Sequence, residues 1–173
     1  YMSCTFDSNS NKVVLACMTG SPDAGSAFVG TVSGNSISFG SKVDFVSNNV
    51  SVVNATFDSN SNKVVISYRD LGNLSYGTAV VGTVSGTSIS FGTPVIWAAM
   101  SHQVGGQTFD TNSNKVVIAY YDTPTATGKA IVGTVSGTSI SFGTAVVFEA
   151  SSATEISATF DSNVNKVVIV YRD

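Results

Sequence analysis

The chain has few of the residues that usually carry chemistry. It contains one histidine, two cysteines and three prolines in 173 residues, and only 11% of its residues are charged. No apolar run approaches the roughly 20 residues that a transmembrane helix needs, so we expect no insertion into a membrane. The net charge is −3, and a nucleic-acid-binding domain would need a clustered basic face. We therefore expect no nucleic-acid partner.

An amphipathic helix is also missing from the pattern. No segment places apolar residues at the i, i+3, i+4 and i+7 spacing of a helix that packs on a core. Hydrophobic residues still make up 43% of the chain, which is enough to bury a core. The sequence therefore predicts an all-β fold.

The two cysteines, Cys4 and Cys17, lie on either side of one expected hairpin turn. The turn places Cys4 opposite Val14 or Leu15, and Cys17 opposite the first two residues. Their Cα atoms are then offset by about three residues of about 3.3 Å each, which is too far for a disulfide. We expect two free thiols, both buried.

What the chain has in abundance is an internal repeat. The segment TFDSNSNKVV at Thr5 returns with small changes at Thr56, Thr108 and Thr159, and its phenylalanines are spaced by 51, 52 and 51 residues. A second unit, GTVSG followed by SISFG, begins at Gly30, Gly82 and Gly133. A period of this length decides the fold class before any other pattern.

Each repeat is expected to contain four short antiparallel strands joined by tight turns. The central strand is apolar on both faces and must therefore be covered on both faces. In the second repeat the expected strands are Asn54–Phe57, Lys63–Tyr68, Ala79–Val84 and Ser88–Phe91.

Four strands in about 51 residues are typical of a β-propeller blade. The pattern FDSNSNKVVIxY resembles the first hairpin of blades in WD40-like and TolB-type propellers, and the repeat length is similar to that of kelch repeats. The resemblance covers the whole chain and implies one propeller region, 1–173. It has blades at about 3–48, 49–100 and 101–152 and a half blade at 153–173.

Three and a half blades are too few to close a ring, since propellers use four to eight. We therefore expect further blades from a longer chain or from other protomers. The chain starts in the middle of a repeat at Tyr1, which favours an excerpt of a longer polypeptide. Its richness in Ser, Thr, Asn and Gly favours an extracellular or virion-surface location.

The repeats differ most from one another in two connections. The connection after the central strand varies, at 18–26, 69–77 and 121–129, as does the one that joins successive repeats, at 46–53, 98–106 and 149–157. In an up-and-down sheet these connections open on one side, where loops carry recognition; neutral drift is the alternative. The expected ligand contacts are Tyr76, His102 and Tyr121. Asp70 and Asp122 either cap the loops or bind a polar ligand.

The repeated turn has the D-x-N-x-N spacing that opens a calcium loop. A lysine follows in place of the usual glycine and second carboxylate, so we expect a turn bonded by its own side chains, with a weak calcium site as the alternative. The residues concerned are Asp7, Asn9, Asn11, Asp58, Asn60, Asn62, Asp110, Asn112, Asn114, Asp161, Asn163 and Asn165.

Catalytic chemistry has little support in the sequence. Hydrolysis needs converging carboxylates, a histidine or a metal, and His102 stands alone in an expected loop. Trp97, Phe45 and Phe148 share a repeat position and are expected to pack between blades rather than to stack on sugars. We expect no catalytic residues and no cofactor.

The sequence therefore favours a non-enzymatic recognition or adhesion module whose ligand is a glycan or a protein, with a lectin-like role as one case. A purely architectural protein that assembles into a ring or array is the alternative. A propeller hydrolase is a third reading, which would need catalytic residues in further blades.

Overall fold

The computed structural model describes residues 1–20, 24–99 and 102–173; the side chains of residues 102–104 lie outside the description. Within these ranges the chain is all-β, without a helix. The strands are β1 (Met2–Asp7), β2 (Lys12–Thr19), β3 (Ala24–Ser33), β4 (Ser36–Phe39), β5 (Val43–Val46), β6 (Val50–Asp58), β7 (Lys63–Asp70), β8 (Tyr76–Ser85), β9 (Ser88–Phe91), β10 (Val95–Ala98), β11 (His102–Asp110), β12 (Lys115–Asp122), β13 (Thr127–Ser136), β14 (Ser139–Phe142), β15 (Val146–Glu149), β16 (Thr154–Asp161) and β17 (Lys166–Arg172).

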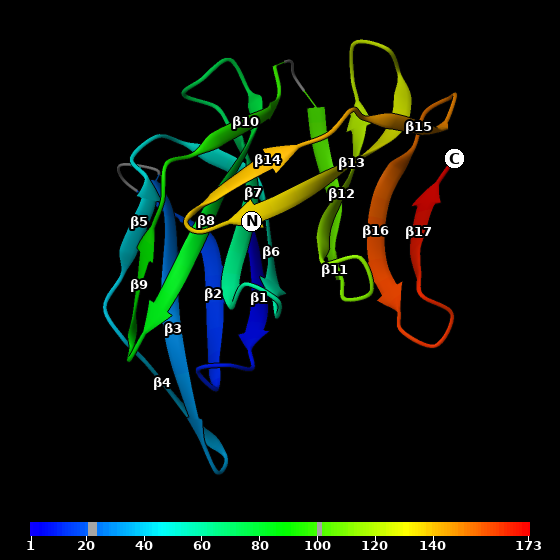
Figure 1. Cartoon of the computed structure of the whole chain (residues 1–173). Helices are drawn as coiled ribbons and strands as arrows, with labels where there is room; N and C mark the ends of the chain where they lie inside the picture. The colour runs from blue at the N-terminus through cyan, green and yellow to red at the C-terminus, as the bar shows by residue number, and fades with distance from the viewer. Residues whose placement is uncertain (21–23, 100–101) are drawn as a thin grey trace.

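Each full repeat forms one antiparallel sheet (Figure 1). In the first sheet the order is β1-β2-β3, and the fourth position is shared by β4 and β5, which both pair with β3. The second sheet, β6 to β10, and the third, β11 to β15, repeat this arrangement. The chain closes with the two-stranded sheet β16-β17, so the predicted three sheets and one hairpin are confirmed.

The fourth strand is more complex than the sequence predicted. We expected a single strand at Ser88–Phe91, but a second segment, Val95–Ala98, continues along the same edge of β8. The inner strand is also longer than predicted, since β6 begins at Val50 instead of Asn54. It was missed because a bulge interrupts its alternation, with the register shifting between Ser51 and Asn54.

The repeated turn is held by its aspartate. Asp7 Oδ1 accepts hydrogen bonds from the backbone N–H groups of Asn9 at 2.9 Å and Ser10 at 3.0 Å, and Ser10 Oγ donates to Asp7 Oδ2 at 2.6 Å. Asn11 then takes the left-handed conformation, with φ of 55°, which asparagine tolerates well. The same bonds recur at Asp58 and Asp110. The predicted side-chain-bonded turn is therefore confirmed.

The hydrophobic cores lie between successive sheets. Val64 and Ile66 of β7 pack against the first sheet, while Val65, between them, packs in the cluster shared with the third sheet. All three side chains are fully buried, and each contributes roughly 1.5–3 kcal/mol to folding. The prediction that the central strand is covered on both faces is confirmed.

One aromatic pair joins each sheet to the next. The ring centroids of Phe45 and Tyr68 are 5.1 Å apart, and those of Trp97 and Tyr120 are 4.9 Å apart. Phe148 and Tyr171 form the third pair at 5.3 Å. These distances are those of favourable aromatic contacts, so the predicted packing role of Trp97 and its equivalents is confirmed.

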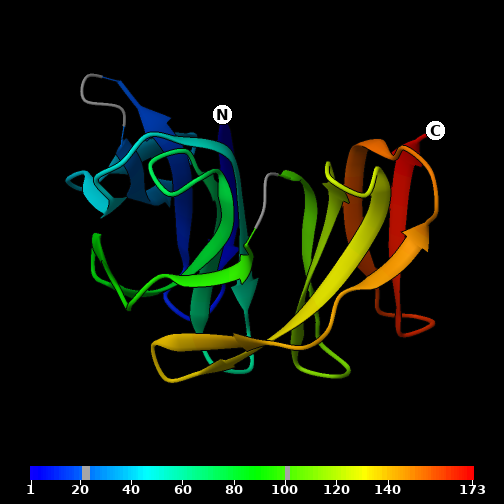
Figure 2. The ribbon, with the colours of Figure 1, turned by 90° about the horizontal axis from the view of Figure 1, so that it is seen from above.

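The two kinds of connection lie at opposite ends of the sheets. In Figure 1 the first-hairpin turns, such as β6–β7 and β16–β17, lie at the lower end, while the β7–β8 and β12–β13 loops lie at the upper end. The view from above shows the sheets following one another along the chain (Figure 2). Their inner strands are in contact in order, β1 with β6, β6 with β11 and β11 with β16.

The cysteine prediction is half correct. Cys4 pairs with Leu15, and Cys17 with Met2, so the expected register is confirmed and both thiols are free. Cys17 is buried, but Cys4 is exposed, because Cys4 pairs with Leu15, and the core shared with the second sheet is formed by the alternate residues Val14 and Ala16. In the part of the chain described, no helix is long and apolar enough to span a membrane.

Candidate functional site

A cavity of about 420 Å³ opens at the upper end of the inner strands. That volume falls within the roughly 300–1,000 Å³ typical of ligand pockets. The starts of β6 and β16, the bulge of β11 and the ends of β7 and β12 supply its walls. The residues that line it are Tyr1, Ser51, Val52, Arg69, Gly105, Tyr121, Ala153, Thr154, Glu155 and Ile156.

The cavity residues occupy equivalent positions in successive repeats. Arg69 and Tyr121 occupy the same repeat position near the end of the central strand, and Met18 and Arg172 occupy it in the other repeats. Ser51 pairs with Arg69 across β6 and β7, as Thr154 pairs with Arg172 across β16 and β17. The second and fourth repeats therefore each present one cross-strand pair at this level, and the side chains differ between the two.

Bulges in the inner strands shape the cavity. The register shifts between Ser51 and Asn54 in β6, and between Thr154 and Ser157 in β16. Val52, with φ of 49°, and Glu155, with φ of 51°, are left-handed within these bulges. This conformation is strained for a β-branched residue such as valine, and bulges of this kind redirect side chains next to binding sites.

Close approach of backbones explains the glycines of β11. A Cβ on Gly105 would overlap Ile156, and a Cβ on Gly106 would overlap the backbone at Ser157 and Ala158. These glycines let β11 and β16 meet, so that the start of β16 forms one wall of the cavity. The Gly-Gly pair in the third repeat is therefore a packing requirement of the site.

The polar groups of the cavity are unevenly satisfied. Ser51 is only 7% exposed, and its Oγ has no hydrogen-bond partner among the described residues. Arg69 is half-buried beside it. At the rim, Glu155 Oε1 is 3.1 Å from Arg172 Nη1, and both side chains are about two-thirds exposed. The interior thus offers donors, while the rim carboxylate is already paired.

Of the predicted ligand contacts, Tyr121 lines the cavity. We expected Tyr121 and Tyr76 in loops, but Tyr121 lies in β12 and Tyr76 is the first residue of β8. Both residues belong to strands because their backbones continue the ladder of the neighbouring strand, Tyr121 opposite Gly128 and Tyr76 opposite Asp70. Tyr76 is not among the cavity residues.

His102 was also expected in a loop. Its backbone lies instead at the start of β11, paired with Asp122, since this inner strand begins earlier than its sequence pattern suggested. Its side chain falls outside the description.

Asp70 and Asp122 close the loops that follow the central strands. Asp70 Oδ1 accepts a hydrogen bond from the Gly72 N–H at 3.0 Å. Asp122 Oδ2 accepts one from Thr125 Oγ1 at 2.7 Å and also pairs with the Lys129 ammonium. Both aspartates are buried and end their strands. This geometry favours the capping role over ligand contact.

Sequence reasoning did not single out Ser51, Arg69, Thr154 or Glu155. A usable signal was present, because all four lie inside the segments that diverge between repeats. The bulge could not be predicted from the sequence, and it determines which of these residues face the cavity.

In the turn proposed as an alternative calcium site, the aspartate carboxylate already accepts hydrogen bonds from the turn itself. Both oxygens of Asp110 accept hydrogen bonds from Ser113, and these bonds together with that of Asn112 hold the pKa of the carboxyl below its usual value. Lys12 and Lys115 reach away from the turn, to Thr31 Oγ1 and Thr134 Oγ1. No group of three or more His, Cys, Asp or Glu residues suited to a metal occurs in the described ranges.

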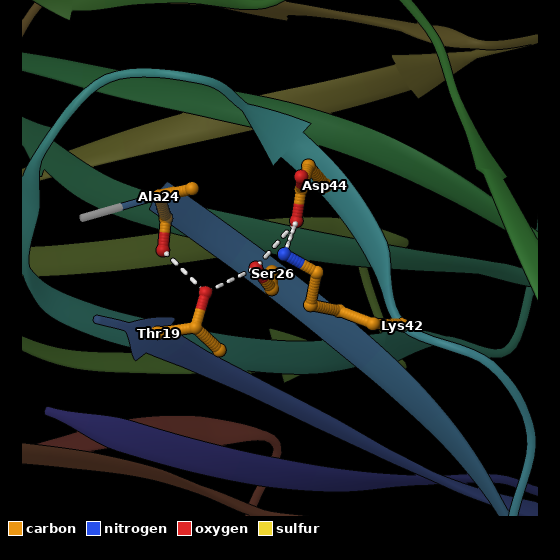
Figure 3. Close-up of polar contacts among 5 residues, drawn as sticks. All are labelled: Thr19, Ala24, Ser26, Lys42 and Asp44. Carbon is orange, nitrogen blue, oxygen red and sulfur yellow. Dashed lines mark hydrogen bonds and ion pairs between the residues drawn. The ribbon is translucent and has the colours of Figure 1, made fainter. Parts of the chain in front are cut away.

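A second polar cluster lies on the first sheet (Figure 3). Ser26 Oγ donates to Asp44 Oδ1 at 2.6 Å and shares a hydrogen bond of 2.8 Å with Thr19 Oγ1. Lys42 Nζ is 3.1 Å from Asp44, and the Ser26 bond, with Lys42, lowers the pKa of Asp44. Because these groups satisfy one another, the cluster joins β5 to β2 and β3 and is a weaker candidate site than the cavity.

Comparison with models of known protein families finds no match for this chain, and comparison with curated proteins finds none either.

Proposed function

We propose that the chain is a run of β-propeller blades that acts as a non-enzymatic recognition or adhesion module. The support for the propeller architecture is that four sheets follow one another with their inner strands in contact. Propellers bring the inner strands of successive blades around a common axis. The cavity at one end of these strands is then the axial opening of the propeller.

One observation carries the recognition role. Apart from Tyr1, every residue that lines the cavity comes from segments that differ between repeats, whereas the opposite turns are nearly identical. Residues that serve only the scaffold would be expected to repeat as the turns do. Divergence concentrated on a concave surface is what a binding site held on a rigid scaffold requires.

The lining groups favour binding over catalysis. Among the described residues that line the cavity, Glu155 is the single carboxylate, and it is paired with Arg172. General acid–base hydrolysis needs two groups that exchange protons in the site. We therefore prefer a recognition module to a propeller hydrolase, with a glycan or a protein outside the cell or on a virion as the ligand.

A printed glycan array tests this role. Wild-type chain and Tyr121→Ala are applied in parallel, with Thr87→Ala, at the exposed turn of the opposite end, as the control. We expect wild type and control to bind the same glycans, and Tyr121→Ala to bind them at least tenfold more weakly, about 1.4 kcal/mol. Melting temperatures establish that all three are folded. Equal binding by Tyr121→Ala contradicts the proposed site.

An architectural role is the second candidate, because apolar residues are exposed on the outer face of the first sheet. Phe6, Ile37 and Phe39 are each about half exposed there. Such a patch is unusual on a monomer and fits packing against a further blade of a longer chain or of another protomer.

A further inference from the structure

We infer that the cavity binds a small hydroxylated carboxylate, with a sugar acid as its chemical class. Arg69 is the partner of the carboxylate, and Ser51 reinforces it. This inference rests on the proposed recognition role and specifies the ligand that the role requires.

Charge is the first argument. Among the described side chains that line the cavity, Arg69 is the guanidinium and Glu155 the carboxylate, and Glu155 is paired with Arg172 at 3.1 Å. Asp70 lies next to Arg69 in β7, but successive residues of a strand point to opposite faces. A guanidinium in the wall of the cavity favours an anionic ligand.

The geometry of Arg69 favours a carboxylate. A guanidinium has five N–H donors in a fixed planar fork, so a contact with one neighbour still leaves donors for a ligand. The fork matches the two oxygens of a carboxylate. A phosphate dianion is less suitable, because its second negative charge would lie near the Glu155 carboxylate.

Ser51 is the independent sign of a ligand. Its hydroxyl is buried to more than nine-tenths and has no partner within the described ranges. Leaving such a group unsatisfied costs about 1–3 kcal/mol, which a bound acceptor would remove. Because Ser51 and Arg69 face each other across β6 and β7, one carboxylate can accept from both.

The remaining walls suit the hydroxylated body of a sugar. Tyr121 offers an aromatic face, and Val52 and Ile156 add apolar surface. Thr154 and Glu155 lie on the opposite wall and can exchange hydrogen bonds with hydroxyl groups. A fatty acid would leave these polar groups unpaired, so a hydroxylated ligand is the better match.

The experiment is a calorimetric titration of the 173-residue chain with sodium glucuronate, glucose and sodium acetate at low salt. We expect glucuronate to bind at least tenfold more tightly than either of the others. Arg69→Gln should lower glucuronate affinity at least tenfold and leave glucose binding unchanged. Arg69→Lys, which keeps the charge but not the fork, should lie between. Ser51→Ala should weaken glucuronate binding several-fold.

Lys166→Gln is the matched control, because it removes one positive charge from an exposed position at the opposite end of β17. It should bind glucuronate as wild type does. Thermal unfolding of each variant separates a lost ligand contact from a lost fold.

Three results overturn the inference. Equal affinity for glucose and glucuronate would show that the cavity does not recognise the carboxylate. Equal affinity for acetate and glucuronate would show that it does not recognise the hydroxylated body. Absence of glucuronate binding rejects the inference altogether. In each case the glycan array tests the broader recognition role separately. If Tyr121→Ala loses binding to glycans that the wild type binds, the recognition site stands. If the array shows no bound glycan at all, glycan recognition is contradicted as well.

Discussion

At the scale of single residues, the glycine that ends each SISFG segment controls how closely two sheets approach. A Cβ on Gly40 would overlap the carbonyl oxygen of Thr87, and one on Gly92 would overlap that of Thr138. Gly143 makes the same backbone hydrogen bond but meets no neighbouring sheet. The repeated glycine is therefore explained by the neighbouring sheet and not by its own turn.

Substitution by alanine should separate these positions. We expect Gly40→Ala and Gly92→Ala to destabilise the fold by about 1–3 kcal/mol, because a backbone carbonyl cannot move aside cheaply. Gly143→Ala should be neutral or stabilise by about 0.4–1 kcal/mol through the unfolded chain. Urea unfolding of the three variants measures this. Equal destabilisation at Gly143 would show that another element covers it in solution.

The turn residues could be predicted because their chemistry is local. Asp7 needs only residues two and three positions away to satisfy its oxygens, and Asn11 needs only its own backbone conformation. Cys4 could not be placed, since its exposure depends on whether a further sheet covers β1. Local bonding is legible in sequence, whereas burial depends on neighbours far along the chain.

At the scale of the strand, β7 contains a buried group that costs stability. Tyr68 is fully buried, and its hydroxyl has no partner in the described part of the chain. Burial raises the pKa of this phenol well above its usual value, and Asp70 raises it further. The phenol therefore resists ionisation for as long as the strand stays packed.

Removing the Tyr68 hydroxyl should increase the stability of the fold, and the increase should be largest at high pH. At neutral pH we expect Tyr68→Phe to be as stable as wild type or about 1 kcal/mol more stable. As the pH rises above 10, the unfolded tyrosine loses its proton before the folded one, so wild-type stability falls; phenylalanine lacks this loss. Urea unfolding at pH 7 and pH 11 should show a larger advantage at pH 11. A clear loss of stability at pH 7 would reveal a partner for the hydroxyl.

The strands could be predicted where their pattern is regular. A β-branched run that is apolar on both faces identified Lys63–Tyr68, and alternation identified Ser88–Phe91, because side chains point to alternate faces of a strand. The start of β6 was missed, since the bulge at Ser51 and Val52 breaks the alternation. The same bulge shapes the cavity, so the feature that conceals the strand from sequence reasoning is the one that builds the candidate site.

At the scale of the whole molecule, equivalent residues differ sharply in exposure. Ile89 of the second sheet is 3% exposed, but its equivalent Ile37 in the first sheet is 47% exposed. Phe91 contacts Phe45 with ring centroids 5.7 Å apart, while its equivalent Phe39 is 49% exposed. We therefore propose that the outer face of the first sheet packs against another sheet of the same type.

That difference predicts how two matched substitutions behave. Phe91→Lys should destabilise the chain by roughly 3 kcal/mol or more, because it removes a packed ring and places a charge between sheets. Phe39→Lys should cost much less and should reduce self-association, which we expect for the wild-type 173-residue chain through this apolar face. Thermal unfolding measures the first effect, and light scattering across a range of concentrations measures the second.

The same pair discriminates between the two proposed roles. Large, uniform assemblies that Phe39→Lys dissolves, with a stability loss close to that of Phe91→Lys, would mean that a second copy covers the face and would favour an architectural protein. Weak association without a defined size would mean that the face awaits a different sheet, which agrees with blades of one propeller that carries a recognition site. A wild-type chain that stays monomeric, with Phe39→Lys unchanged, would contradict the inference that this face is an interface.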